Sequence, residues 1–341
     1  MFMRDGEVRC LKRDDNALTA VIEFLSAFVL FLMILTAFLS QAETVPLIRD
    51  EKIIFDLLNK GDINLSKNIA KAFGKKESTM EIRRVGLVKN SLQIRAAFRD
   101  KSVKSYARRN VGLMYYDSYY NELAAYVISK YLGLNIIPAT VFRSIGIAKK
   151  GLEPSKELRK GSLQLWIENT VSLYDLTSNN LPYPGALDYK NSQIKEIKAF
   201  DCIIGNVDRH AGNLLVDLNE RFEDQGEVTG RKKAYLGKIW AIDHSRSFYR
   251  GTRPDIRACQ LSKLKSGAIS IQFIQGMRAW KIEEVEKKLR ASGISEQQLE
   301  RIKLKTLERR FQRVKKHFEE EQLKSAMADE EYYSSGLWHR V

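Results

Sequence analysis

The segment FDCIIGNVDRHAGNLLVD, residues 200–217, is the most informative part of this chain. Its apolar runs, CII and LLV, enclose a polar stretch that contains Asp208, His210 and Asn213. One interpretation is an ordinary loop between a helix and a strand, in which the aspartate stabilises a turn. The other is an active site, because apolar flanks would hold these polar groups in fixed positions.

Asp208 and Asn213 have the spacing D-x-x-x-x-N, which suits phosphoryl transfer. In such sites a carboxylate orients or deprotonates the attacking hydroxyl, and an amide oxygen a few residues later helps to hold a magnesium ion. A second carboxylate must reach that ion from another strand. The segment GKIWAIDHSRSF (237–248) offers Asp243 at the end of an apolar strand. Each feature alone is typical of a turn, but their combination and order favour a catalytic site.

The residues before this segment predict a small lobe of mixed structure. Alternating apolar residues indicate strands, whereas apolar steps of three and four residues indicate a helix. Gly133 is the expected stop of that helix. A polar, helical segment at 50–80 is expected to come first. After it we expect two strands within 82–100, joined by a turn at 89–91. A helix at 117–133 and two further strands, 135–146 and 161–169, follow.

The residues after a proline- and glycine-rich loop at 178–192 predict a mostly helical part. A helix begins at Ser192, and two short strands, 213–216 and 238–242, flank a polar hairpin at 218–233. Helices resume from about 280, with a capping box in SEQQ at 295–298. One face of the last helix is an apolar stripe that we expect to face the core, made of Leu307, Phe311, Val314 and Phe318. The opposite face is basic and is expected to be solvated. Nucleic-acid binding by this helix is the less favoured alternative, because no base-reading pattern accompanies the charge.

IIGNVDRHAGNLLV followed by WAIDHSRSF resembles the catalytic and metal loops of atypical kinases. These include type II phosphatidylinositol 4-kinases, the Golgi secretory-pathway protein kinases and, more loosely, HipA-type kinases. Upstream, IRAAFRD resembles the strand that ends in a phosphate-binding lysine, and NELAAYVISKYLGLNIIPATV resembles the helix and strand that follow it. GSLQLWIEN resembles the strand that runs into the adenine-contacting hinge. The resemblance covers about residues 82–250 and implies ATP and Mg²⁺ (or Mn²⁺) as cofactors, without identifying a substrate.

The resemblance implies roles for the residues of the two loops. Asp208 is the expected catalytic carboxylate, and Asn213 and Asp243 are the expected metal ligands. His210 is a second candidate for proton transfer. The alternative for His210 is a histidine that supports the loop by bonding a backbone carbonyl.

The resemblance also implies a nucleotide-binding set, in which Glu122 pairs with a phosphate-binding cation and Ile167 and Glu168 lie at the hinge. Two departures bear on activity. The expected lysine is Arg99, and arginine does not replace lysine conservatively, so nearby lysines (Lys89 or Lys101) are alternatives. Asp243 is followed by histidine and serine instead of a glycine-containing motif, and no glycine-rich phosphate loop is visible in the sequence.

The formal net charge of +15 favours an anionic partner. We expect a nucleotide and an acidic protein or phospholipid substrate, and we do not expect nucleic acid. The three cysteines form no CxxC pair, which argues against a zinc site. A Cys202–Cys259 disulfide is expected only if the domain is extracytoplasmic, and two buried free thiols are the favoured alternative.

Residues 19–40, TAVIEFLSAFVLFLMILTAFLS, are apolar apart from Glu23 and a few hydroxyls. A helix of this length reaches across a hydrocarbon core of ~30 Å, so we expect a transmembrane helix or a cleaved signal rather than a buried core helix. Basic residues before it favour an inside N-terminus, and thus a single-pass membrane protein with its domain extracytoplasmic. The layout KRDDNALTAVIEFL (12–25), with a charged leader and one glutamate early in the apolar run, also resembles archaeal type IV pilin-like leaders.

The prediction is therefore an α+β chain with a two-lobed protein-kinase-like fold, behind an N-terminal transmembrane helix. The expected parts are a leader 1–18, the membrane segment 19–40, a tether and first helix 41–81, a β-rich N lobe 82–168, a mostly helical C lobe 169–330 and a tail 331–341. The expected function is a membrane-anchored kinase that transfers the ATP γ-phosphate, with magnesium, to a protein or lipid hydroxyl. The alternatives are a weak or inactive pseudokinase that acts as a membrane-tethered binding module, and an envelope- or pilus-associated component.

Overall fold

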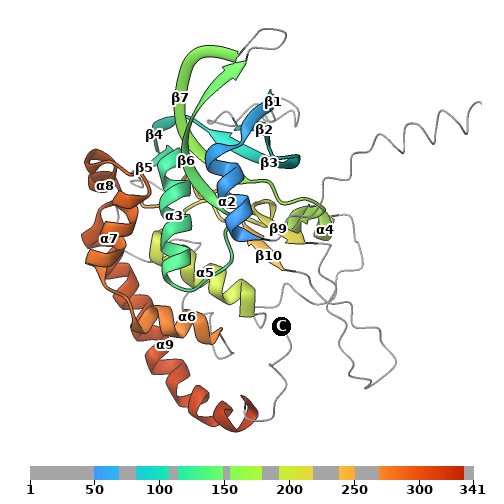
Figure 1. Ribbon diagram of the computed structural model, residues 1–341. Helices are drawn as coiled ribbons and strands as arrows, with labels where there is room; N and C mark the ends of the chain where they lie inside the picture. The colour runs from blue at the N-terminus through green and yellow to red at the C-terminus, as the bar shows by residue number, and fades with distance from the viewer. Residues whose placement is uncertain are drawn as a thin grey trace, which may run out of the picture. The chain divides into compact units, whose positions relative to one another are not determined.

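The structure, a computed structural model, is shown in Figure 1. It describes residues 50–68, 82–106, 114–148, 154–178, 192–217, 238–249 and 269–333 of the chain. The chain divides into residues 1–46 and 47–341, and all described residues belong to the second unit.

The predicted single-pass membrane localisation is contradicted. Among the described residues, no helix is both long and apolar enough to cross a membrane. Helix α9 (Leu304–Tyr333) has 30 residues, but charged side chains recur along it. The stretch 19–40, on which the prediction rested, lies outside the described residues, as does the pilin-like leader.

Five antiparallel strands form one sheet, in the order β1-β2-β3-β7-β6. The turn between β2 and β3 falls at Asn90 and Ser91, which have φ values of 50° and 64° and so confirm the predicted hairpin. The expected helix over 50–80 is wrong for residues 61–68, because the chain leaves α2 at Gly61 and pairs with β2, whereas residues 69–80 lie outside the described residues. The strands are β1 (Asp62–Asn68), β2 (Ile82–Lys89), β3 (Leu92–Arg99), β6 (Thr140–Ala148) and β7 (Pro154–Leu165).

Helices α2 (Glu51–Lys60) and α3 (Tyr119–Tyr131) pack against this sheet (Figure 1). Leu57 and Leu58 of α2 are buried with Phe98 of β3 in one hydrophobic cluster. Gly133 ends α3 with φ +71°, as predicted, and a Cβ at this position would meet the Gln272 carbonyl oxygen at 2.7 Å. The sheet and α2 therefore share a core of their own.

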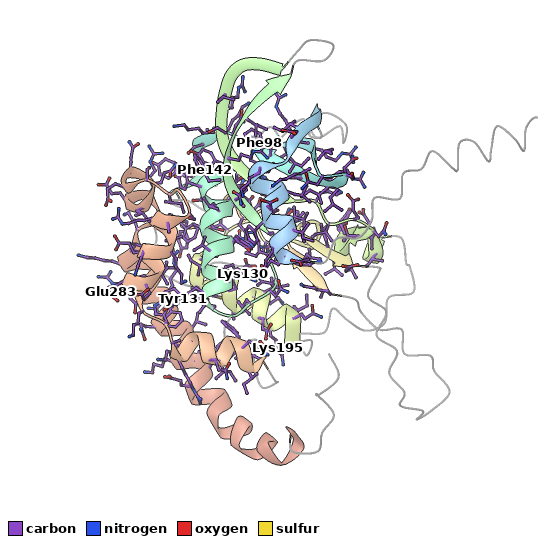
Figure 2. The ribbon with its side chains drawn as sticks, viewed as in Figure 1. Phe98, Lys130, Tyr131, Phe142, Lys195 and Glu283 are labelled. Atoms are coloured by element: carbon purple, nitrogen blue, oxygen red, sulfur yellow. The ribbon has the colours of Figure 1, made fainter. Side chains whose placement is uncertain are left out.

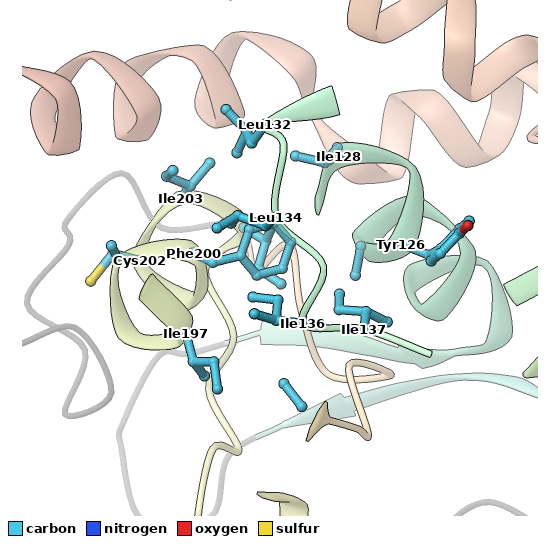
Figure 3. Close-up of a cluster of buried hydrophobic side chains, with 14 of the residues drawn as sticks. Tyr126, Ile128, Leu132, Leu134, Ile136, Ile137, Ile197, Phe200, Cys202 and Ile203 are labelled. Atoms are coloured by element: carbon cyan, nitrogen blue, oxygen red, sulfur yellow. The ribbon is translucent and has the colours of Figure 1, made fainter. Parts of the chain in front are cut away.

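A second hydrophobic cluster joins α3 to the helices that follow in the chain. Figure 3 shows Ile136 and Leu134, after α3, beside Phe200 of α5. At the end of α3, the Tyr131 hydroxyl donates to the Ala279 carbonyl oxygen at 2.9 Å, and Figure 2 shows Tyr131 close to the helix that bears Glu283. The remaining helices are α4 (Leu173–Ser178), α5 (Ser192–Ile204), α6 (Ile271–Arg278), α7 (Ile282–Ala291), α8 (Glu296–Ile302) and α9.

Two local predictions in this part are confirmed. Ser295 and Gln298 form the capping box at the start of α8. The stripe on α9 is buried, with no member more than 4% exposed: Leu307, Phe311, Val314 and Phe318. Helix α6 was not predicted from the sequence.

A small sheet, β10-β9-β8, positions the two polar loops. The 3-10 helix η1 (Ala211–Asn213) runs directly into β9, and Asp243 follows β10, which confirms the two predicted strands. Strands β4 and β5 form a separate pair that leads into α3. The strands are β4 (Ser102–Tyr106), β5 (Met114–Ser118), β8 (Thr170–Ser172), β9 (Leu214–Asp217) and β10 (Ile239–Ala241). The predicted hairpin 218–233 and most of the loop 178–192 lie outside the described residues.

Cys202 is disulfide-bonded, so the favoured expectation of free thiols is wrong for this residue. Its side chain is buried on α5 (Figure 3). The other two cysteines of the chain, Cys10 and Cys259, both lie outside the described residues.

Candidate functional site

Asn213 and Asp243 lie close together at the ends of paired strands. The Ile242 N–H donates to the Asn213 carbonyl oxygen at 3.0 Å. Arg209 Nη1 donates to the carbonyl oxygens of both Asn213 and Ile242, at 2.8 and 2.6 Å. One buried guanidinium therefore fastens the two loops that hold the predicted metal ligands.

The loop that contains Asp208 is held by buried polar side chains. The Asn206 side chain accepts from the Asp208 N–H at 3.0 Å and donates to Asp201 at 3.1 Å. Asn213 Nδ2 donates to the Asp208 carbonyl oxygen at 3.0 Å, which leaves the Oδ1 atom of Asn213 as the one that could bind a cation. Arg209 Nε donates to Asp201 at 2.8 Å and completes the support of the loop. The apolar flanks thus enclose a loop that buried side chains hold through hydrogen bonds.

Asp243 adopts an unusual backbone conformation and is ionised. Its φ is +58°, in a region that aspartate tolerates better than most residues. Burial acts to raise the pKa of Asp243, but Arg99, Ser245 and Arg246 outweigh it and lower the pKa to about 2. Oδ1 accepts from Arg99 Nη1 and from Ser245 Oγ, each at 3.0 Å.

Arg99 and Glu122 face each other, which confirms the predicted pairing of these two positions. Arg99 Nε lies 3.4 Å from Glu122 Oε1, and their side chains are 10% and 2% exposed. Lys89 instead pairs with Asp56 on α2, and Lys101 is exposed. The cation at the end of β3 is therefore an arginine that contacts both Glu122 and Asp243.

His244 directly follows Asp243, where a glycine-containing motif was expected, and is fully buried. Arg209 Nη2 lies 2.7 Å from His244 Nε2, so the ring nitrogen accepts and the ring is neutral. Burial, reinforced by Arg209, lowers the pKa of His244. His244 Nδ1 lies 3.7 Å from Glu122 Oε2, which connects the Arg209 loop to the Arg99–Glu122 pair.

His210 is exposed, and its Nδ1 accepts from the Gly212 N–H at 3.1 Å at the start of η1. This contact agrees with a loop-supporting histidine, although the bond is to a backbone N–H and not to a carbonyl. The proton-transfer role of His210 stays a prediction.

Ile167 and Glu168 lie between β7 and β8. The Ile167 carbonyl oxygen accepts from Thr170 Oγ1 at 3.3 Å. The Glu168 carboxylate pairs with the guanidinium of Arg95 on β3. Because that carboxylate is occupied, a nucleotide contact at this position would use the backbone.

Three residues of the site were not predicted from the sequence. Arg246 Nη1 donates to Asp208 Oδ2 at 2.9 Å, and Arg246 Nε donates to Asp117 Oδ2 at 3.0 Å. Asn121 Nδ2 donates to the Ser245 carbonyl oxygen at 2.6 Å and so ties α3 to the loop after Asp243. The sequence offered little signal for them: Asp117 and Asn121 stand among tyrosines, and Arg246 lies three residues after Asp243.

Comparison with solved structures finds proteins of similar fold. Hydra Fam20 solved with sugar aligns with a TM-score of 0.51 at 15% identity, over 82% of this chain and 93% of that chain. The Golgi casein kinase aligns with a TM-score of 0.50 at 14% identity, over 79% of this chain and 75% of that chain. The same kinase with Mn/ADP bound gives a TM-score of 0.48 at 16% identity, over 79% of this chain and 76% of that chain.

The sequence comparisons are less informative. No protein-family model matches the chain. Protein Rv2133c of Mycobacterium tuberculosis is 25% identical over 150 residues, which is 36% of this chain. The match spans 44% of the mycobacterial protein.

The chain therefore has an α+β, kinase-like fold of the kind seen in hydra Fam20 and the Golgi casein kinase. At these identities the likeness establishes the fold alone. The resemblances to type II phosphatidylinositol 4-kinases and HipA-type kinases stay predictions.

Proposed function

We propose that this chain is an ATP-dependent phosphotransferase that transfers the γ-phosphate to a hydroxyl group of a protein or a lipid. The proposal rests on one observation: Asp208, Asn213 and Asp243 meet at one site, beside the buried Arg99–Glu122 pair. Asp208 would orient or deprotonate the acceptor hydroxyl. Arg99 would bind phosphate oxygens through its planar guanidinium.

The donors present fit Mg²⁺ or Mn²⁺. Asp243 is an ionised carboxylate, and Asn213 has an uncommitted amide oxygen, so both offer the hard oxygen ligands that these ions prefer. Among the described residues, no group of three or more His, Cys, Asp or Glu side chains could hold a metal unaided. Mg²⁺ is commonly bound by one or two carboxylates together with substrate phosphates, so this donor set suits a metal–nucleotide complex. The ion, when bound, neutralises phosphate charge.

The substrate and the lobe boundaries belong to the same proposal. We place the boundary between the N lobe (82–168, to which α2 and β1 are added because they share its core and sheet) and the C lobe (169–330) after Glu168, because the segment around Glu168 links the large sheet to the small one. The net charge of +15 supports an acidic protein or a phospholipid as the substrate. Assays should begin with these two classes.

Turnover of ATP with Mg²⁺ or Mn²⁺ tests the proposal. Asp243→Asn should abolish metal-dependent turnover, because it removes the ionised ligand. Asp208→Asn should lower turnover by roughly 10²–10⁴-fold and leave nucleotide binding intact, because it removes only the group that meets the acceptor hydroxyl. Asp56→Asn, on α2, is the matched control and should behave as wild type. A wild-type protein that neither binds nor turns over ATP with either metal would refute the proposal.

One observation favours a second candidate, a catalytically weak binding module. Arg99 pairs with Asp243, and Arg246 pairs with Asp208, so both acidic groups already have a cation. A metal–nucleotide complex must compete with these arginines for the carboxylates. Metal-dependent nucleotide binding without any turnover would support this second candidate over the first.

A further inference from the structure

Arg246 lies on the proposed catalytic carboxylate. Its Nη1 donates to Asp208 Oδ2 at 2.9 Å, and its Nε donates to Asp117 Oδ2 at 3.0 Å. The Asp117 side chain is 2% exposed, whereas those of Arg246 and Asp208 are 26% and 31% exposed. Buried Asp117 thus holds one edge of the guanidinium, and partly exposed Asp208 accepts a hydrogen bond from the other edge.

The side chains around Arg246 have a net negative charge, so a phosphate that binds there needs a cation beside it. Six side chains share the site: Asp117, Glu122, Asp208, Asp243, Arg99 and Arg246. Their four carboxylates outnumber their two guanidiniums, so the group has a formal charge of −2, which one divalent ion would neutralise. A γ-phosphate adjacent to Asp208 brings additional negative charge, and like charges at such distances repel strongly. Arg99 forms ion pairs with Asp243 and Glu122, whereas Arg246 forms an ion pair with Asp208 itself.

We propose that Arg246 is a catalytic residue that binds the γ-phosphate of ATP and the transferring phosphoryl group. This inference rests on the proposed kinase function and adds a residue to it. Asp117 holds the guanidinium in place while its other edge moves its hydrogen bonding from Asp208 to the phosphate oxygens. Asp208 is thereby released to accept a hydrogen bond from the acceptor hydroxyl.

The transfer step is balanced without Arg246 changing any covalent bond. The bond between the γ-phosphorus and the oxygen that bridges to ADP breaks, and a bond from the acceptor oxygen to phosphorus forms. The acceptor proton passes to Asp208, and ADP leaves with the electron pair of the broken bond. Arg246 donates hydrogen bonds to the oxygens of the transferring group, where negative charge is concentrated.

A purely structural Arg246 would make a different prediction. In that case it only neutralises Asp117 and Asp208, and its loss would weaken the binding of all nucleotides to a similar degree or not at all. A γ-phosphate ligand instead distinguishes ATP from ADP. The ratio of the two affinities therefore separates the two roles without requiring turnover.

The experiment is calorimetric titration of the whole protein, in Mg²⁺, with ADP and with a non-hydrolysable ATP analogue. Wild type should bind the analogue more tightly than ADP. Arg246→Gln should weaken analogue binding by roughly 10- to 100-fold, the effect of losing a charge-assisted hydrogen bond, and leave ADP binding unchanged. Arg290→Gln removes an exposed, paired arginine on α7 and should match wild type. A melting curve checks that each variant is folded.

Arg246→Lys provides a second arm if the glutamine variant does not fold, because lysine keeps a cation beside Asp117. It should retain ADP binding and lose part of the preference for the analogue, since an ammonium cannot make the planar, two-edged contact. The inference is overturned if both variants keep the wild-type preference, or if they lose ADP and analogue affinity equally. If wild type binds nucleotide and only the preference test fails, the proposed function stands without Arg246. If wild type binds neither nucleotide, both the function and the inference fail.

Discussion

Replacing Arg99 with methionine should destabilise the protein by about 3–5 kcal/mol, the cost of breaking a buried ion pair by removing one partner. Glu122 is 2% exposed, and neither of its carboxylate oxygens has a hydrogen-bond partner. Its other close neighbour, His244, is neutral. Methionine has similar length and no charge, so the variant leaves Glu122 buried without a cation.

The assay is urea denaturation followed by circular dichroism, with a thermal melt alongside. At about 2–4 °C per kcal/mol, typical of domains of 150–250 residues, the loss corresponds to a drop in Tm of roughly 6–20 °C. Glu122→Gln in the Arg99→Met background should recover most of it, because a neutral amide is much less costly to bury than an unpaired carboxylate. A double-mutant cycle should therefore give a coupling energy of at least ~1 kcal/mol between the two positions.

The control is Arg290→Met, at an exposed arginine that pairs with Glu286. It should leave the denaturation midpoint almost unchanged, because exposed ion pairs contribute little. Two results would refute the reasoning about Arg99. One is a cost below ~1 kcal/mol for Arg99→Met, as for an exposed pair, and the other is a Glu122→Gln effect that is the same in both backgrounds.

Two further predictions concern packing and pH. Gly161→Ala should destabilise the sheet by about 1–3 kcal/mol in urea denaturation, because a Cβ there would lie 2.1 Å from the Arg99 carbonyl oxygen and 2.7 Å from the Phe98 ring; an unchanged midpoint would contradict this. Burial raises the pKa of Glu196 above its ordinary value of 4.5, so the native state binds the Glu196 proton more tightly than the unfolded state. The contribution of Glu196 to stability therefore falls as pH rises from about 4.5 through the folded pKa. Glu196→Gln keeps an acceptor for the Ser270 N–H and should gain stability relative to wild type between pH 5 and pH 7.5, whereas a difference independent of pH would disprove the assignment.

Much of the local structure could be predicted from the sequence. The turn at Asn90 and Ser91, the stop at Gly133 and the capping box at Ser295 each depend on residues a few positions apart. The same is true of the buried stripe on α9, because a helix brings residues three and four apart onto one face. These features need no knowledge of the rest of the chain.

The long-range geometry of the site was predicted only in part. The pairing of Arg99 with Glu122, and the approach of Asp243 to Asn213, were expected from the resemblance to kinases and not from spacing alone. The strand β1 was missed, because a short polar segment pairs with β2 only when that strand is already in place. The membrane localisation rested on the apolar run 19–40 and its flanking charges and was contradicted.

Sequence by itself determined which residues could form strands, helices and a polar loop with candidate metal ligands, since those properties depend on local pattern and side-chain chemistry. Tertiary structure alone decided that Arg246 contacts Asp208, 38 residues earlier, and Asp117, 129 residues earlier. It also decided that His244 connects Arg209 to Glu122. The physical reason is that a buried charge needs a partner, and tertiary packing supplies that partner from any part of the chain. The distance in sequence between the two residues follows no repeating pattern, so it cannot be recognised in advance.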